Sequence, residues 1–289
     1  MQHSRSLTQK SASNLALAFI MLPRHRRDAM AALYAFCRAV DDVADEDAIP
    51  VAIRREQLAA WRADIRRACG TDEPEFVLNQ EFQPVIAQFK LPFGLLDEVI
   101  QGCEMDLDIL RYETQEQLEQ YCYRVASAVG LLSIEIFGYQ NQACHAYAVY
   151  LGKALQLTNI LRDVKNDAAR GRIYLPLSEL ARFGVTEQEI LEGNYSDRYF
   201  KLAESIAARA RHFYQLARTT LPAEDRKAMV AAELMGTVYW QLLRKLEANR
   251  FNVFGAKPVK LSKFKKISLI FGAWLRFTAG STSTRYGQP

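Results

Sequence analysis

The chain has 289 residues, of which 49% are hydrophobic and 24% are charged. These proportions are typical of a globular protein with a substantial core, and they exclude a wholly disordered chain. The net charge of +4 conceals an asymmetry, because residues 248–289 hold eight Lys and Arg and no Asp or Glu, so that the remainder is mildly acidic.

Helical periodicity dominates the sequence and predicts an all-α fold. Apolar residues recur at intervals of three and four positions, which is the pattern of a helix with a buried face. The segments with this pattern are 27–45, 53–69, 95–108, 117–137, 143–167, 199–220 and 225–248. Most prolines fall between these segments and no linker separates two parts, so we expect residues 1–289 to form a single domain.

Two segments are apolar on most of their surface, namely 125–137 and 143–160. Helices of this kind belong in the middle of a bundle. A bundle with apolar central helices can enclose a hydrophobic cavity. We expect bulky residues such as Phe19, Phe36 or Phe137 to set the depth of that cavity.

Acidic residues at the end of the first predicted helix form one candidate site. Asp41 and Asp45 are four positions apart and therefore share one helical face. Like charges at this spacing destabilise a helix, and the residues before them are apolar instead of forming a polar stripe. A solvated acidic helix end is the alternative interpretation.

A second acidic face occurs near the end of segment 143–167. Asn159, Asp163 and Asp167 are each four positions apart, after turns that are apolar. Oxygen ligands from two facing helices suit magnesium, which usually also keeps waters and substrate phosphates. Together the two motifs predict a magnesium site whose ions neutralise a departing diphosphate.

Arginines accompany both acidic motifs. Arg38 precedes Asp41 by three positions, Arg162 adjoins Asp163, and Arg172 follows the second motif. Guanidinium groups bind phosphate oxygens in a fork-like geometry. We expect these arginines to contact a diphosphate, and ordinary surface ion pairs are the alternative.

A third motif, residues 121–130, combines aromatic and small side chains. Ala126 and Gly130 allow a hydrocarbon chain or a neighbouring helix to approach closely. Tyr121 and Tyr123 offer ring faces, which attract cations. A carbocation needs a dry wall without strong nucleophiles, and tyrosine rings meet that need, although core packing explains the same residues.

These motifs resemble those of the squalene and phytoene synthase family of head-to-head prenyl synthases. The similar segments are 32–45, 121–130 and 152–176, with weaker similarity from about Leu15 to Leu246. The resemblance implies the isoprenoid synthase type of helical bundle around a central apolar cavity. It also implies three magnesium ions and two substrate pockets.

The resemblance assigns roles to individual residues. The catalytic metal ligands that it implies are Asp41, Asp45, Asn159, Asp163 and Asp167. The substrate contacts that it implies are Tyr34, Arg38, Gln156, Asn159, Arg162, Arg172 and Tyr174. It places Tyr121 near the reacting carbons as a catalytic residue. Three further acids have either a supporting role or a surface position: Asp42, Asp106 and Asp108.

Within the family, segments 104–108, 124–130 and 167–172 are most similar to the bacterial presqualene diphosphate synthases of hopanoid pathways. This similarity implies a prenyltransferase that condenses two farnesyl diphosphates to presqualene diphosphate with magnesium and without NADPH. Released diphosphate is favoured as the proton acceptor, because tyrosine is a poor base at its usual pKa near 10.

Three alternatives stay open. The first is a complete squalene synthase that reduces the intermediate with NADPH. The second is a phytoene synthase that uses geranylgeranyl diphosphate. The third belongs to another class: a catalytically silent, membrane-associated assembly protein, against which the intact aspartates argue.

The two ends of the chain are expected to differ from the body. Residues 1–12 and 278–289 are expected to be unstructured. Residues 259–277 interleave lysines with aromatic and aliphatic side chains, which predicts a basic amphipathic helix. Such a helix either lies on an anionic membrane or packs on the bundle with its lysines in solvent, and this pattern does not favour nucleic acid.

The cysteines and the hydrophobic segments bear on localisation. The five cysteines form no CxxC pair and mostly sit among apolar residues, which favours reduced thiols. The N-terminus lacks the apolar region of a signal peptide, and no apolar run reaches the roughly 18 residues of a membrane span. We therefore expect a cytoplasmic protein, with peripheral contact at the inner membrane surface if the basic helix lies there.

Overall fold

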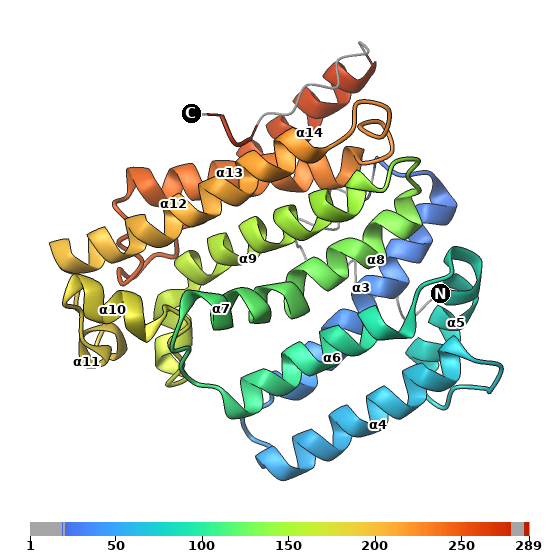
Figure 1. Ribbon diagram of the computed structural model, residues 1–289, viewed down its shortest axis with the longest axis horizontal. Helices are drawn as coiled ribbons and strands as arrows, with labels where there is room; N and C mark the ends of the chain where they lie inside the picture. Colours follow the sequence, from blue (N-terminus) through green and yellow to red (C-terminus); the bar gives the residue numbers. More distant parts are fainter. Residues whose placement is uncertain (1–18, 20, 279–285, 289) are drawn as a thin grey trace.

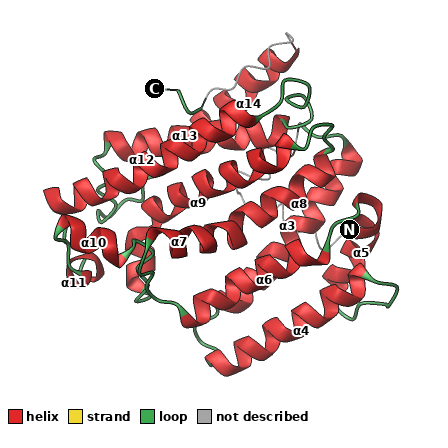
Figure 2. Ribbon diagram, in the orientation of Figure 1, coloured by secondary structure: helices red, strands yellow, loops and turns green. Residues whose placement is uncertain are grey.

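The computed structural model describes residue 19, residues 21–278 and residues 286–288. The regular elements in these residues are all helices (Figure 2), apart from one isolated bridge between Arg111 and Ile173. They are α3 (Arg24–Asp45), α4 (Val51–Cys69), α5 (Val77–Phe89), α6 (Phe93–Asp108), α7 (Gln115–Cys122), the π-helix η1 (Tyr123–Ser127), α8 (Ala128–Phe137), α9 (Ala143–Ala169), α10 (Leu177–Phe183), α11 (Glu187–Leu191), α12 (Asp197–Thr220), α13 (Val230–Ala248) and α14 (Lys263–Thr278). The predicted all-α fold is confirmed.

Helix α9 runs through the middle of the bundle (Figure 1). It packs against α12 and α13 on one side and against η1 and α8 on the other. Helices α3 and α6 pack on α8, and α4 and α5 cover their outer side. Helices α10 and α11 lie at one end (Figure 1), and α14 lies on α13. Burial of α8 and α9 on most sides explains why their sequences lack a polar stripe.

Prolines mark where several helices begin. Pro23, Pro50, Pro92 and Pro176 directly precede α3, α4, α6 and α10. A proline costs little there, because the first turn of a helix leaves backbone N–H groups without an intrahelical partner. Helix α12 instead begins with a side-chain cap, in which Ser196 Oγ accepts a hydrogen bond from the backbone N–H of Tyr199 at 3.1 Å.

Three helices were absent from the sequence prediction. Helix α5 has Pro84 in its interior, which obscures the helical pattern. Helices α10 and α11 have only seven and five residues, too few for periodicity to emerge. The helix predicted over 225–248 begins at Val230, because residues 223–229 form turns.

The C-terminal region contains more structure than expected. The basic helix expected over 259–277 is α14, which spans Lys263–Thr278. Residues 286–288 were expected to be unstructured, but Tyr286 is fully buried beside α12 and α13. The expectation for residues 1–12 falls outside the described residues. Among the described helices, none combines the length and hydrophobicity that crossing a membrane requires.

Candidate active site

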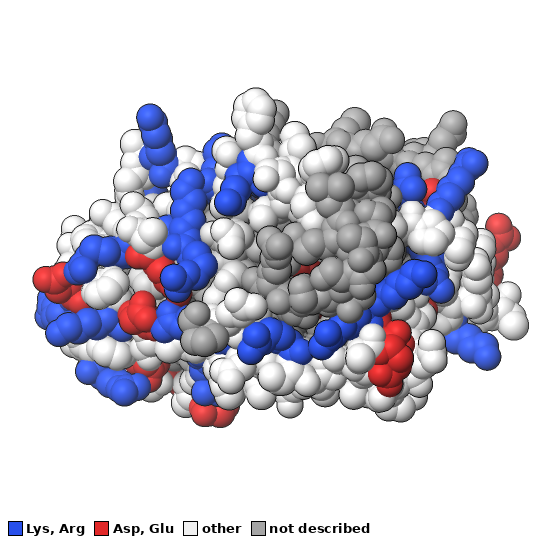
Figure 3. Space-filling model, turned by 90° about the horizontal axis from the view of Figure 1, so that it is seen from above, with Lys and Arg blue, Asp and Glu red and all other residues white. Residues whose placement is uncertain are grey.

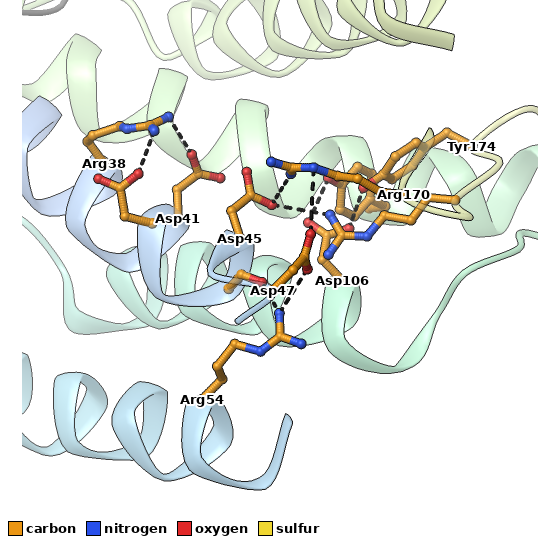
Figure 4. A network of polar contacts seen from close by, with 12 residues as sticks. Arg38, Asp41, Asp45, Asp47, Arg54, Asp106, Arg170 and Tyr174 are labelled. Atoms are coloured by element: carbon orange, nitrogen blue, oxygen red, sulfur yellow. Dashed lines mark hydrogen bonds and ion pairs between the residues drawn. The ribbon is translucent and has the colours of Figure 1, made fainter. Parts of the chain in front are cut away.

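The first aspartate motif occupies the last turns of α3, and Asp41 and Asp45 share one face as predicted (Figure 4). Arg38 Nη1 contacts Asp41 Oδ2 at 3.0 Å. Asp45 Oδ1 is bound by Arg170 at 2.9 Å and by Arg172 at 3.2 Å. These ion pairs join α3 to the segment that follows α9, so they bring the two predicted motifs to one place.

The second motif lies on α9, where Asn159, Asp163 and Asp167 share one face. Arg162 binds Asp163 through two nitrogens, with Nε and Oδ1 at 2.8 Å. Asn159 Nδ2 donates to Gln156 Oε1 at 3.3 Å, but its buried Oδ1 has no hydrogen-bond partner among the described residues. An unpaired buried oxygen is costly unless something binds it, so this atom is suited to hold a ligand.

The electrostatics of the site favour added positive charge. Burial, followed by repulsion from Asp45, raises the pKa of Asp41 to about 6. Burial, followed by repulsion from Asp163, raises the pKa of Asp167 to about 7. A nearby cation favours the ionised form of such carboxyls. The site therefore presents partly buried acidic groups whose negative charge the protein alone compensates only in part.

The donor atoms fit a hard divalent ion such as magnesium, which prefers carboxylate and amide oxygens. Within the described part of the chain, however, no three His, Cys, Asp or Glu side chains form a group that could hold one ion. Asp41, Asp45 and Asp163 are instead paired with arginines. Ion binding would therefore exchange with these pairs and free the guanidinium groups for phosphate.

A buried cluster around Asp106 of α6 adds to the site. Asp106 accepts hydrogen bonds from Tyr121 at 3.0 Å and from Tyr174 at 2.7 Å. The rings of Tyr112, Tyr121 and Tyr174 pack with centroids between 5.2 and 5.9 Å apart. Burial raises the pKa of Asp106 to about 6, and burial with the charge of Asp106 raises the pKa of Tyr121 far above its usual range. Tyr121 is thus a hydrogen-bond donor and a poor base.

The sequence analysis left Asp106 unresolved and did not name Tyr112. A signal for Asp106 exists, because it follows Val99 and Cys103 at helical spacing on the buried face of α6. The two other unresolved acids lie at the surface. Asp42 pairs with Arg38, and Asp108 pairs with Arg55 at 2.6 Å, with both acids about half exposed.

A π-helical turn, η1, interrupts the helix predicted over 117–137. Two glycines face it closely. A Cβ on Gly152 would lie 2.7 Å from Cα of Ser127, and a Cβ on Gly102 would lie 2.6 Å from Cγ1 of Val125. Ser127 Oγ also donates to the backbone oxygen of Val149 at 2.9 Å. Single π-helical turns frequently occur at functional sites, and this one forms part of a cavity wall.

The cavity has a volume of about 210 Å³ and is lined by residues of α3, η1, α8, α9 and α13. Gln156 and Asn159 lie at its polar end, while Tyr147 lies at the other end of its α9 wall. The distance along α9 between positions 147 and 159 is about 18 Å. The expected apolar cavity is therefore present, with one end at the second aspartate motif.

Of the three bulky residues that were expected to set the depth of this cavity, two line its wall. Phe19 and Phe137 line it. Phe36 does not, because its ring packs against Trp61 and Phe82 in the core between α3, α4 and α5. The expectation that Phe36 sets the depth of the cavity was therefore wrong.

Three further predicted residues lie outside the lining of this cavity. Tyr34 is half-buried on α3, two turns before Asp41 on the same face. Arg172 is buried. Arg162 interacts with Tyr239, a cavity-lining residue that the sequence analysis missed.

Comparison with known proteins gives consistent matches. A family model described as squalene/phytoene synthase matches residues 8–265. The presqualene diphosphate synthase of Rhodopseudomonas palustris is 36% identical over 260 residues, which cover 89% of this chain and 91% of that protein. The 15-cis-phytoene synthase of Synechocystis sp. is 35% identical over 286 residues, which cover 94% and 83% of the two chains.

Two solved structures share the architecture. A dehydrosqualene synthase in complex with ligand superposes with a TM-score of 0.84 at 27% identity, covering 96% of each chain. The squalene synthase HpnC from Alicyclobacillus acidocaldarius superposes with a TM-score of 0.78 at 28% identity, covering 86% of this chain and 93% of that one.

Proposed function

This chain belongs to the squalene/phytoene synthase family, whose members are prenyltransferases, and on that premise we propose that it condenses two farnesyl diphosphates head to head to presqualene diphosphate. The observation that best supports this proposal is the cavity along α9. One end of the cavity is polar, at Gln156 and Asn159, and the rest of its wall is mostly apolar. A hydrocarbon chain with a diphosphate head has the matching chemistry, because apolar pockets with a few convergent polar groups orient such ligands.

Three arginines bind diphosphate in the proposed reaction: Arg38, Arg162 and Arg172. Each is paired with an aspartate in the structure, at distances between 2.5 and 3.2 Å. Forked guanidinium contacts suit phosphate oxygens as well as carboxylates. Substrate binding therefore exchanges one anionic partner for another and leaves no arginine unpaired.

The residues proposed to hold magnesium are Asp41, Asp45, Asn159, Asp163 and Asp167. Bound magnesium supplies positive charge that stabilises the leaving diphosphate. The observations that support this set are the Oδ1 of Asn159, which has no hydrogen-bond partner in the described part of the chain, and the raised pKa values of Asp41 and Asp167.

The tyrosine cluster faces the reacting carbons in this proposal. Tyr121 and Tyr174 donate hydrogen bonds from their hydroxyl groups to Asp106, which fixes the orientation of aromatic rings that can stabilise a nearby carbocation. Their raised pKa values keep both hydroxyls protonated and therefore unavailable as bases, and the released diphosphate accepts the proton that is lost as the cyclopropane closes. NADPH has no part in this half-reaction.

Relatives named presqualene diphosphate synthase and phytoene synthase match this chain at similar identity. The main alternative to the proposed function therefore differs from it in the chain length of the substrate. Phytoene synthase chemistry on geranylgeranyl diphosphate is the second candidate. It requires a deeper cavity, because each substrate chain is one isoprene unit longer.

A product assay tests the proposal. The purified protein is incubated with magnesium and either farnesyl or geranylgeranyl diphosphate, with and without NADPH, and the products are identified by mass spectrometry. We expect presqualene diphosphate from farnesyl diphosphate in both samples. Squalene formed only with NADPH would make this a complete squalene synthase, phytoene would favour the second candidate, and no product from either substrate would contradict catalysis.

The proposal includes peripheral contact between α14 and an anionic membrane. Phe264 is 87% exposed, and Ile267 and Phe271 are each 58% exposed. Lys260 and Lys265 are exposed near them. Lys and Arg side chains project from this side of the molecule (Figure 3). Exposed aromatic residues beside lysines are typical of helices that lie in a membrane interface.

A further inference from the structure

The far end of the cavity is closed by Tyr147 of α9, whose side chain is fully buried. Its hydroxyl donates to Glu233 Oε1 on α13 at 2.9 Å. The same carboxylate oxygen accepts a hydrogen bond from the hydroxyl of Tyr286. One carboxylate therefore joins a wall of the cavity to the C-terminal region.

Tyr286 occupies a slot that two glycines make possible. A Cβ on Gly236 would lie 2.5 Å from Cε1 of the Tyr286 ring. Gly287 has a φ of 63°, and a Cβ there would lie 2.7 Å from the backbone oxygen of Tyr214. The Tyr286 ring packs against that of Tyr214 at 5.7 Å and has no exposed surface. These close approaches show that the ring fills its slot.

The arrangement fixes the position of Tyr147. Both tyrosines donate to the same oxygen of the partly buried Glu233 carboxylate, so the Tyr286 hydroxyl is one of the contacts that hold this carboxylate in place. Ala231, Ala232 and Met235 of α13 also line the cavity, directly beside Glu233 and Gly236. The side of α13 that receives Tyr286 therefore adjoins the side that faces the hydrocarbon pocket.

We propose that Tyr286 is a specificity-determining residue that sets the depth of the prenyl-chain cavity by holding Glu233 and Tyr147 in place. This inference rests on the proposed function. With Tyr286 in its slot, Tyr147 closes the pocket opposite Asn159 and favours a C15 chain over a C20 chain. When the ring is absent, the slot behind Tyr147 becomes space into which that wall can move.

Two variants test the proposal by different routes. Tyr286→Ala removes the ring. Gly236→Ala keeps every aromatic side chain but displaces the ring, because the new Cβ overlaps it. The matched control is Tyr199→Ala, which removes a tyrosine that is equally buried but packs against Tyr195 and Phe254, away from the cavity.

The measurement is the ratio of kcat/KM for geranylgeranyl diphosphate to that for farnesyl diphosphate, with both substrates competing in one reaction. Binding of the corresponding non-hydrolysable thiolodiphosphates is measured by calorimetry. We expect both ratios to rise about tenfold or more in Tyr286→Ala and Gly236→Ala, since small changes in an apolar pocket discriminate by roughly 10- to 200-fold. The control should keep both ratios within about twofold of the parent.

Unchanged ratios in folded Tyr286→Ala and Gly236→Ala, or an equal rise in Tyr199→Ala, would overturn the inference. Circular dichroism and thermal melts establish folding. Failure of the proposed function is a separate result, in which the unmodified protein neither converts nor binds either prenyl chain.

Discussion

Asp106 is a single acid on an otherwise apolar helix face, and its two tyrosine partners come from positions 15 and 68 residues further along the chain. Its neighbours in sequence therefore could not reveal its partners. The aspartates on α3 and α9 were predictable, because a spacing of four residues fixes a shared helical face whatever surrounds it. Local geometry was available from the sequence, whereas the burial and partners of a lone polar residue depend on tertiary contacts.

We predict that Asp106→Asn raises the unfolding free energy relative to the parent protein more at pH 8 than at pH 5. The pKa of Asp106 is raised to about 6 in the folded protein, so ionisation weakens the folded state progressively as pH rises from about 4 to about 6. Between pH 5 and pH 8 this amounts to about 1 kcal/mol. Denaturant titrations at both pH values measure the gain, while product formation should fall because one tyrosine loses its acceptor.

The exposed neighbour Asp108 supplies the control for this prediction. Asp108→Asn removes an acid that is about half exposed and paired with Arg55, so its effect on the unfolding free energy should stay within about 0.5 kcal/mol. An Asp106→Asn variant whose stability relative to the parent is the same at pH 5 and pH 8 would contradict the account of the buried carboxyl.

At the scale of elements, periodicity located the long helices but not the irregular ones. Helix α5 is interrupted in pattern by Pro84, and η1 differs from an α-helix only in its hydrogen-bond spacing, which leaves no clear trace in the apolar pattern. The sequence feature that relates to η1 is the pair of glycines that pack against it. Gly102 and Gly152 lie on other helices, so their connection with η1 appears only when the helices are packed together.

Gly152→Ala tests whether close packing of α9 on η1 matters. The added Cβ would meet backbone atoms of Ser127 at 2.7 and 2.8 Å, which cannot move as a flexible side chain can. We expect a loss of about 1–3 kcal/mol in unfolding free energy and a lower kcat as the cavity wall shifts. The control is Gly94→Ala in α6, where nothing lies within 4 Å and where a gain of up to about 1 kcal/mol is expected. Equal stability of the two variants would argue against a packing role for Gly152.

For α14, vesicle flotation provides the test. The protein should bind vesicles that contain anionic phospholipid and remain unbound to purely zwitterionic ones, and binding should weaken as salt is raised. Phe264→Ser should reduce binding several-fold without changing the melting temperature, since that ring is 87% exposed. Leu191→Ser, at an exposed position in α11, is the matched control. Binding that does not depend on lipid charge would contradict the proposed contact.

At the scale of the whole molecule, the helical class and the apolar cavity were predictable, because helices without a polar stripe must lie inside a bundle. The end of the cavity was not. Tyr147 and Glu233 are 86 positions apart and Glu233 and Tyr286 are 53 positions apart, and their contact depends on the packing of α9 against α13. A pairing between distant residues of ordinary type leaves no local pattern in a single sequence.

The reactivity of the cysteine thiols can be used to test the packing of the whole fold. All five are free thiols. Burial raises the pKa of Cys37 to about 12 and that of Cys69 to about 11, so little thiolate is available at pH 8. We expect a thiol reagent such as dithionitrobenzoate to react at least about tenfold more slowly with the native protein than with the protein in urea. Fast native labelling of all five thiols would contradict the described burial.

The contact between Asp45 and Arg172 spans 127 positions, and this separation has a consequence for synthesis of the protein. A ribosome adds about 5–20 residues per second, so roughly 6–25 s pass between the emergence of the first aspartate motif and the arrival of the arginines that neutralise it. During that interval the helices that cover the apolar face of α3, among them α4, α5 and α6, have already emerged, but the acids of α3 are only partly compensated. The nascent chain therefore carries an incompletely compensated acidic face until the arginines arrive, and the ion pairs that join α3 to the segment after α9 form late.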